Sequence, residues 1–172
     1  MHTDTWAFAL HGGAGAVAGR DYTETESHLA KLAEACRHKL DRGGRALNVV
    51  EFAVHELETC GLYVAGRGSA PNSAGYVELD ASIMDGATRA AGAVAALRDF
   101  VSPIGVARAV MEKTPHVMLA GEGARRFAVD MGFPEEDLLT DEARQAWQRS
   151  LDHTVTPWAT RSAYSESFSG SL

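Results

Sequence analysis

The chain has 172 residues, of which 45% are hydrophobic and 23% charged, the composition of one globular domain or of part of a larger one. A net charge of -7, with no run of five or more basic residues, argues against a nucleic-acid surface. Apolar stretches stay well below the ~18 residues of a membrane helix, and the first residues lack a signal-peptide pattern. Cys36 and Cys60 form no metal-ligand pattern, so we expect reduced core thiols and a cytoplasmic protein.

The first third of the chain predicts a strand followed by two helices. Residues 6–10 (WAFAL) are a short apolar run stopped by glycines, which indicates a buried strand. Residues 23–43 place apolar side chains on one helical face, with Thr23 or Thr25 as the cap and two glycines at the end. Residues 46–60 repeat the helical spacing.

The middle of the chain predicts a hairpin. Residues 76–84 and 90–97 read as strands, with Asp85 and Gly86 in the turn between them. Both strands are apolar on both faces in places, which indicates that another layer covers them.

The last third predicts helices and then a linker. Ser102 and Pro103 begin a helix that reaches about residue 113, and further helices are expected over residues 122–131 and 134–149. Residues 154–172 are rich in serine and threonine and lack periodicity, which is linker composition. The order of elements predicts an α/β fold.

The loop after the first strand contains two incomplete motifs. Gly13, Gly15 and Ala18 match a dinucleotide fingerprint, but neither a helix nor a second parallel strand follows at once. The His-Gly-Gly run also fits an esterase oxyanion loop, yet the chain lacks the required G-x-S-x-G nucleophile. We therefore expect the imidazole of His11 either to hold loop backbone in place or to take part in chemistry.

Other polar residues offer no complete active site. Asp80 and Asp85 lie on opposite faces of a strand and its end, so each is expected to hold neighbouring backbone by hydrogen bonds. The seven histidines show no zinc spacing. No serine, cysteine or lysine has an evident partner base.

Several blocks, in order and spacing, carry a specific resemblance: ALHGGAGA, LETCGLYVAGRGS, YVELDASIMDG, AGAVAAL, PIGVARAVMEKTPHVMLAGEGA and MGF. From Trp6 to about Phe133 the chain resembles the α-subunit of the plant-type asparaginases, the isoaspartyl peptidases. The resemblance implies one half of the αββα sandwich of the N-terminal nucleophile hydrolases. Residues 1–153 would form the α-subunit part of that domain, and residues 154–172 a linker ending near the autocleavage site at Leu172.

The resemblance also implies what the missing half supplies. A β-subunit from the same precursor would begin with a threonine whose hydroxyl is the nucleophile and whose α-amine is the base. Two such αβ pairs would form an (αβ)2 heterotetramer that hydrolyses β-aspartyl amide bonds. No catalytic residue is then expected in this chain, and no cofactor for catalysis.

Two supporting sites are carried over by the resemblance. His11, Gly12 and Gly13 would lie beside the nucleophile. A structural sodium ion would be held by main-chain carbonyls, which suit a hard cation and leave side chains such as Tyr63 and Arg67 free to vary. The matching carbonyls belong to Leu57, Glu58, Cys60, Tyr63, Ala65 and Arg67.

The chain departs from the family pattern at two positions and leaves alternatives open. Val64 replaces an asparagine that relatives usually carry near the catalytic threonine, and valine offers no hydrogen bond. The residue before the threonine is usually glycine, whereas this sequence ends at Leu172. Pro71 and the IGVAR run are also similar to glycosylasparaginases. The AGRGS and MEKTPH blocks favour the isoaspartyl peptidases instead. A dipeptidase restricted to one partner, such as β-aspartyl-arginine, and a non-catalytic binding remnant are the other readings.

Overall fold

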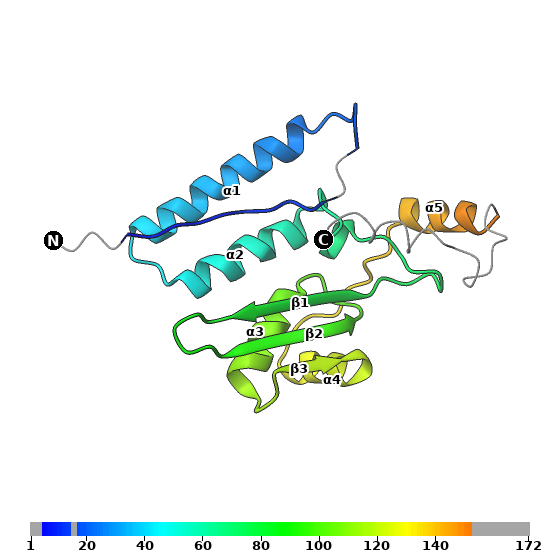
Figure 1. Ribbon diagram of the computed structural model, residues 1–172. Helices are drawn as coiled ribbons and strands as arrows, with labels where there is room; N and C mark the ends of the chain where they lie inside the picture. The colour runs from blue at the N-terminus through cyan, green and yellow to red at the C-terminus, as the bar shows by residue number, and fades with distance from the viewer. Residues whose placement is uncertain (1–4, 15–16, 153–172) are drawn as a thin grey trace, which may run out of the picture.

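In the computed structural model, which describes residues 5–14 and 17–152, the chain has the mixed α/β architecture expected from the sequence (Figure 1). The helices are α1 (Thr23–Asp41), α2 (Ala46–Thr59), α3 (Pro103–Lys113), α4 (Gly121–Asp130) and α5 (Asp141–Asp152), with a short 3-10 helix η1 (Gly66–Gly68). The strands are β1 (Leu79–Met84), β2 (Ala91–Leu97) and β3 (Met118–Ala120). None of the helices in these ranges is long and apolar enough to cross a bilayer.

Both predicted helices are confirmed as α1 and α2, and they pack together as a helical hairpin. Their contact face contains Leu32 and Cys36 from α1 and Val49 and Ala53 from α2. The expected threonine cap of α1 is wrong: the N-cap residue is Tyr22, whose side chain makes no capping hydrogen bond. Asp21 precedes it, and its Oδ1 accepts hydrogen bonds from the backbone N–H and the hydroxyl of Thr23 at 2.9 and 2.6 Å. A carboxylate at this end also suits the positive end of the helix dipole.

Residues 6–10 do not form the predicted strand. In Figure 1 they run as an extended segment beside α1 and α2, and no β-ladder includes them within the described part of the chain. Phe8 and Leu10 pack against the α1–α2 core. The predicted burial is only partial, since Phe8 and Leu10 are half-buried and Trp6 is 38% exposed. Helices cannot supply the ladder hydrogen bonds that make a strand.

The predicted hairpin is confirmed, with a shorter first strand. Strands β1 and β2 pair antiparallel, with Met84 opposite Ala91. The turn closes through Asp85, whose N–H donates to the carbonyl of Ala90 at 2.9 Å and whose Oδ1 accepts the N–H of Ala87 at 3.0 Å. The left-handed position of this turn is Arg89, at φ 61°, rather than Gly86.

Two features of the sheet escaped the sequence analysis. Strand β3 pairs parallel to β2 and gives the order β1-β2-β3. The register shifts between Leu79 and Ala81, and there the Asp80 carboxylate accepts the N–H of Ala96 at 2.8 Å. The prediction that Asp80 and Asp85 hold neighbouring backbone is therefore confirmed.

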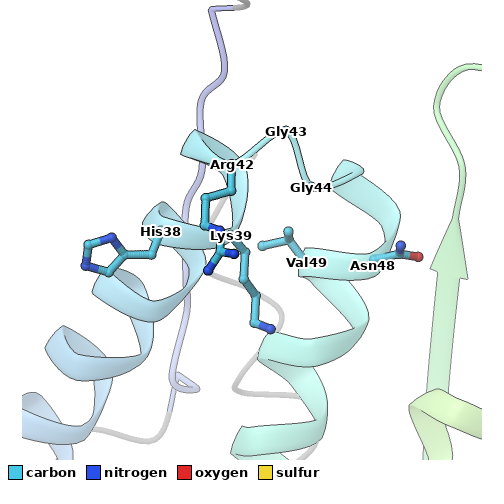
Figure 2. Close-up of a pocket in the computed structure, with 7 residues that line it drawn as sticks. All are labelled: His38, Lys39, Arg42, Gly43, Gly44, Asn48 and Val49. Atoms are coloured by element: carbon cyan, nitrogen blue, oxygen red, sulfur yellow. The ribbon is translucent and has the colours of Figure 1, made fainter.

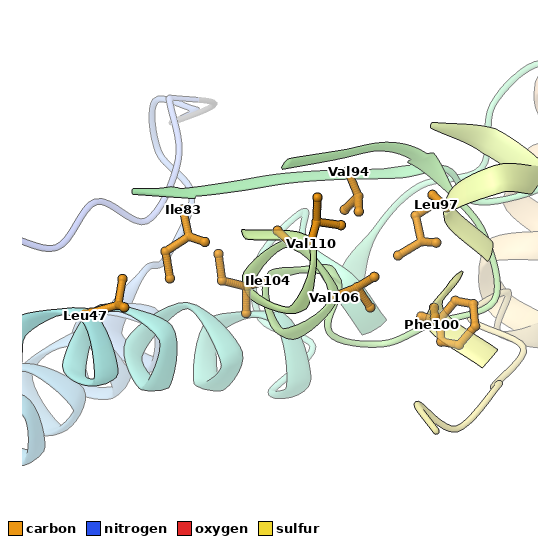
Figure 3. Close-up of a cluster of buried hydrophobic side chains, with 11 residues drawn as sticks. Leu47, Ile83, Val94, Leu97, Phe100, Ile104, Val106 and Val110 are labelled. Atoms are coloured by element: carbon orange, nitrogen blue, oxygen red, sulfur yellow. The ribbon is translucent and has the colours of Figure 1, made fainter. Parts of the chain in front are cut away.

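One face of the sheet is covered by α3 and α4, as Figure 3 shows for the buried side chains between the layers. Ile83, Val94 and Leu97 from the strands meet Ile104 and Val110 from α3. The opposite face carries Met84 and Met118, which are 57% and 54% exposed. The sheet therefore has one packed face and one open face in the described structure.

The last helix begins later than predicted. Residues 134–140 are not helical, because the N–H of Glu136 donates to the carbonyl of Asp99 at 2.8 Å and ties this segment across the fold. Helix α5 starts after Thr140, whose Oγ1 accepts the N–H of Ala143 at 3.1 Å. The predicted linker over residues 154–172, with the boundary at Leu172, lies outside the described residues.

The two cysteines differ in environment. Both are free thiols. Cys36 is fully buried in the α1–α2 core, but Cys60 is exposed, so the prediction of a core thiol is wrong for Cys60. Cys60 ends up outside the core because it follows the last residue of α2, where the chain leaves the packed face.

Candidate functional site

The loop that follows α2 carries the carbonyl groups predicted to hold a cation. The last carbonyls of a helix have no intrahelical partner. Within the described residues, the carbonyl oxygens of Glu58, Cys60 and Tyr63 accept no hydrogen bond from a backbone N–H. Ala65 differs, because its carbonyl accepts the N–H of Gly68 at 3.0 Å. The loop therefore presents oxygen atoms that need a partner.

Two glycines of this loop, Gly66 and Gly68, pack directly against main-chain carbonyls. A Cβ atom at Gly66 would lie 2.6 Å from the carbonyl oxygen of Val101 and closer still to that of Glu58. A Cβ atom at Gly68 would lie 3.0 Å from the carbonyl oxygen of Gly61 and closer still to that of Tyr63. Only glycine allows the backbone to approach its own carbonyls so closely. This oxygen-rich cradle fits a hard cation such as sodium.

Side-chain clusters offer no alternative metal site. Across the residues that the structure describes, no group of three or more His, Cys, Asp or Glu side chains is placed to hold an ion.

Tyr63 is fixed by its side chain, so the expectation that it can vary freely is wrong. Its ring is buried and its hydroxyl lies 3.0 Å from Nδ1 of His28 on α1. The hydroxyl also donates to the carbonyl of Thr25 at 3.4 Å. A Cβ atom at Gly12 would come within 3.1 Å of the Tyr63 ring. The loop after α2 and the His-Gly-Gly segment are therefore in contact, as a shared site requires.

His11 has the structural role considered in the sequence analysis. Its Nδ1 accepts the N–H of Gly13 at 3.2 Å, and Gly13 has a φ of 110° that favours glycine. The imidazole thus holds the turn of the His-Gly-Gly segment. The dinucleotide reading of this segment depends on Gly15, which lies outside the described residues.

Two neighbouring loop side chains behave differently. Arg67 forms a two-pronged ion pair with Glu136, so it also does not vary freely: it ties the loop to the segment before α5. The side chain of Val64, in contrast, is 84% exposed. An exposed apolar side chain between two fixed neighbours leaves a surface that the isolated chain does not cover.

Glu58 is the buried charged residue below this loop. It is 4% exposed, and both carboxylate oxygens are used: Oε2 accepts the hydroxyl of Ser102 at 2.7 Å, and Oε1 accepts the N–H of Ile104 at 3.2 Å. Glu58 therefore caps α3 from another helix. Burial raises the pKa of Glu58 to about 7, against the lowering effect of these two hydrogen bonds. The sequence analysis singled out only its main-chain carbonyl.

A serine–histidine pair lies next to Glu58 and was also missed. Nδ1 of His55 is 2.8 Å from the hydroxyl of Ser102, at the wall of a hollow of about 230 Å³ between α2 and α3. In a catalytic pair the serine donates its proton to the histidine. Here Ser102 donates to Glu58, so His55 must be the donor. The hydrogen bonds therefore run from His55 through Ser102 to Glu58, a direction that suits a structural role.

A second hollow, about 420 Å³, lies at the turn between α1 and α2 (Figure 2). Helix α2 has 14 residues, so its two ends are about 20 Å apart. Two basic side chains that line the hollow have partners: Lys39 lies 4.1 Å from the ring centre of Phe52, and His38 pairs with Glu34 at 2.9 Å. The hollow is separate from the loop after α2.

Comparison with known proteins identifies the family of this chain. The family model described as Asparaginase_2, asparaginase, matches residues 4–168. This chain belongs to the asparaginase family. The resemblance stated from the sequence blocks is confirmed.

Three relatives show how much of an asparaginase-family protein is present. The isoaspartyl peptidase/L-asparaginase of Danio rerio is 42% identical over 151 residues, covering 86% of the chain and 49% of the relative. The plant-type L-asparaginase of Pyrococcus furiosus is 46% identical over 148 residues, covering 83% and 46%. The isoaspartyl peptidase of Salmonella typhimurium is 39% identical over 166 residues, covering 87% and 52%. The chain spans about half the length of the curated relatives it matches.

Proposed function

We propose that this chain is the α-subunit of an isoaspartyl peptidase with L-asparaginase activity, which hydrolyses β-aspartyl amide bonds. The observation that carries the proposal is the family match over residues 4–168, together with relatives named isoaspartyl peptidase and plant-type L-asparaginase that are about twice as long. The other half of such a protein would supply the nucleophile.

The proposed chemistry divides between the two halves. A threonine at the start of the β-subunit attacks the amide carbonyl, and its own α-amine takes the hydroxyl proton and passes it to the amine that leaves as the C–N bond breaks. Water then hydrolyses the resulting ester, which frees the aspartyl carboxylate and restores the threonine hydroxyl. In this scheme the present chain positions the nucleophile and transfers no proton itself. The His-Gly-Gly segment, fixed by His11 and in contact with Tyr63, would support the nucleophile. Val64 would face the substrate.

The open parts of the fold support a partner that completes an αββα sandwich. Strand β1 is an edge strand in the described sheet, and the face with Met84 and Met118 is uncovered. Residues 6–10 are extended without a strand neighbour in the described structure. An open edge and an extended segment are the features that accept added strands. We assign them to the β-subunit, with two αβ pairs forming an (αβ)2 assembly.

The cradle after α2 is proposed to hold a structural sodium ion. The main-chain carbonyls of Glu58 and Tyr63 are the best supported ligands, because they lack backbone donors in the described residues and lie against Gly66 and Gly68. The carbonyl of Cys60 also lacks a backbone donor there. The carbonyls of Leu57, Ala65 and Arg67 complete the proposed set. Bound there, the ion would fix the loop and take no part in bond breaking.

Expression of the complete reading frame tests the proposal. We expect two chains on a denaturing gel, with N-terminal sequencing of the second reporting threonine and locating the cut relative to Leu172. The purified protein should hydrolyse β-aspartyl dipeptides and asparagine, and alanine in place of that threonine should abolish both cleavage and hydrolysis. An uncut chain that is inert on these substrates would refute the assignment and favour a non-catalytic binding protein.

Val64 gives a specific reason to compare substrates. Its exposed side chain replaces the hydrogen-bonding asparagine expected from the resemblance, so the range of leaving groups should differ. A panel of β-aspartyl dipeptides, with β-aspartyl-arginine included, separates a broad enzyme from a restricted one. Cleavage of a glycosylated asparagine instead would place the protein with the glycosylasparaginases.

A further inference from the structure

Glu58 connects three parts of the fold. Its side chain, from the last turn of α2, reaches the start of α3 through Ser102 and Ile104. Its main-chain carbonyl faces Gly66, directly beside the carbonyl of Val101. One residue therefore links the end of α2, the glycine cradle and the segment that leads into α3.

The first turn of α3 depends on this contact. Ser102 occupies the N-cap position of α3 but makes no capping hydrogen bond with its own side chain. The N–H of Ile104 is buried and is satisfied by Glu58 instead. An uncompensated buried N–H is costly, so the position of α3 is coupled to that of Glu58. Val101 lies immediately before this turn, and its carbonyl moves with it.

We propose that the carboxylate of Glu58 is a positioning residue for the cation cradle. By holding the start of α3, it fixes the Val101 carbonyl against Gly66, and thereby holds Gly66 against the carbonyl of Glu58, the proposed ligand. The other side-chain anchors of the loop act elsewhere: Tyr63 binds α1 residues and Arg67 binds Glu136. The inference rests on the proposed sodium site.

The test uses the protein expressed from its complete reading frame and measures the sodium dependence of its thermal midpoint, with choline chloride at equal ionic strength. Glu58→Leu removes both hydrogen bonds, and Ser102→Ala removes one of them. Since one such bond is worth a factor of about five in a binding constant, the sodium concentration for half the shift should rise at least about ten-fold in Glu58→Leu. Ser102→Ala should raise it about five-fold, which keeps the test decisive should Glu58→Leu fail to fold.

Two controls separate positioning from general destabilisation. Glu58→Gln keeps the contact, because the amide oxygen accepts the Ile104 N–H and the amide nitrogen donates to the Ser102 hydroxyl. Glu51→Leu removes a different carboxylate of α2, one that pairs with Arg108, beyond the first turn of α3. Both variants should keep the wild-type sodium dependence within about two-fold, and Glu51→Leu should do so even if its midpoint falls.

Three outcomes would overturn the inference. If Glu58→Leu, or Ser102→Ala in its place, retains the wild-type sodium dependence, Glu58 does not position the cradle. If Glu58→Gln raises the sodium concentration for half the shift as much as Glu58→Leu does, the negative charge of Glu58 matters rather than its hydrogen bonds. If the wild-type protein shows no sodium dependence, the cation assignment fails as well, although peptidase activity would still stand on its own assay.

Discussion

The replacement of Gly66 by alanine tests the cradle geometry most directly. Gly66 has a φ of 51°, which costs an alanine about 1–2 kcal/mol. The added Cβ would also lie 2.6 Å from the Val101 carbonyl and closer to that of Glu58. Both neighbours are backbone atoms and cannot rotate away, so overpacking should add about 1–3 kcal/mol. We expect Gly66→Ala to destabilise the protein by about 2–5 kcal/mol.

The same loop provides a matched control for Gly66→Ala. Gly61 also has a left-handed φ, 77°, but nothing lies within 4 Å of a Cβ placed there. Gly61→Ala should therefore show only the conformational cost of about 1–2 kcal/mol. Urea unfolding of the complete protein, followed by circular dichroism, gives the loss of unfolding free energy for both variants. The comparison holds when the unfolding free energy of each protein falls with urea concentration at the same slope. A Gly66→Ala variant within about 0.5 kcal/mol of Gly61→Ala would refute the close approach of these carbonyls.

Three further predictions address side chains outside the cradle glycines. Tyr63→Phe should lower the free energy of unfolding by about 1 kcal/mol, because it removes the hydroxyl bonds to α1 while keeping the ring; no loss in urea unfolding would contradict those bonds. Iodoacetamide at pH 8.5 should label Cys60 and spare Cys36, because burial shields the Cys36 thiol and raises its pKa. Peptide mass spectrometry reads this out, and equal labelling in the native protein would exclude the buried position. Asp80→Ala should cost about 1.5 kcal/mol by removing the acceptor at the β2 irregularity, whereas Ser82→Ala on the same strand face should be nearly neutral in the same unfolding assay.

Sequence reasoning succeeded where structure is local. The helices over residues 23–41 and 46–59 follow from apolar spacing and terminal glycines, and the hairpin follows from two apolar runs around Asp85. These signals depend on neighbours a few residues away, so the sequence contains them. Strand β3 has only three residues, too few for a periodic pattern, and it exists because β2 lies alongside.

The failures share a dependence on distant partners. Residues 6–10 carry a strand pattern but lie against helices in the described chain. Tyr63 was treated as a main-chain ligand alone, although its hydroxyl binds residues more than thirty positions earlier. The buried side chain of Glu58 was missed because no local pattern indicates that a carboxylate will cap a helix 44–46 residues away. The cradle itself entered through the resemblance, since main-chain ligands leave little trace in side-chain identity.

The open edge of β1 has a practical consequence for work on this protein. An unpaired strand edge beside an apolar sheet face is a template for pairing with other copies of the same chain. Met84 lies at the end of that strand and is exposed. Produced without whatever covers this edge, the chain should associate edge to edge and precipitate. The solubility of the chain therefore indicates whether a partner covers the edge of β1.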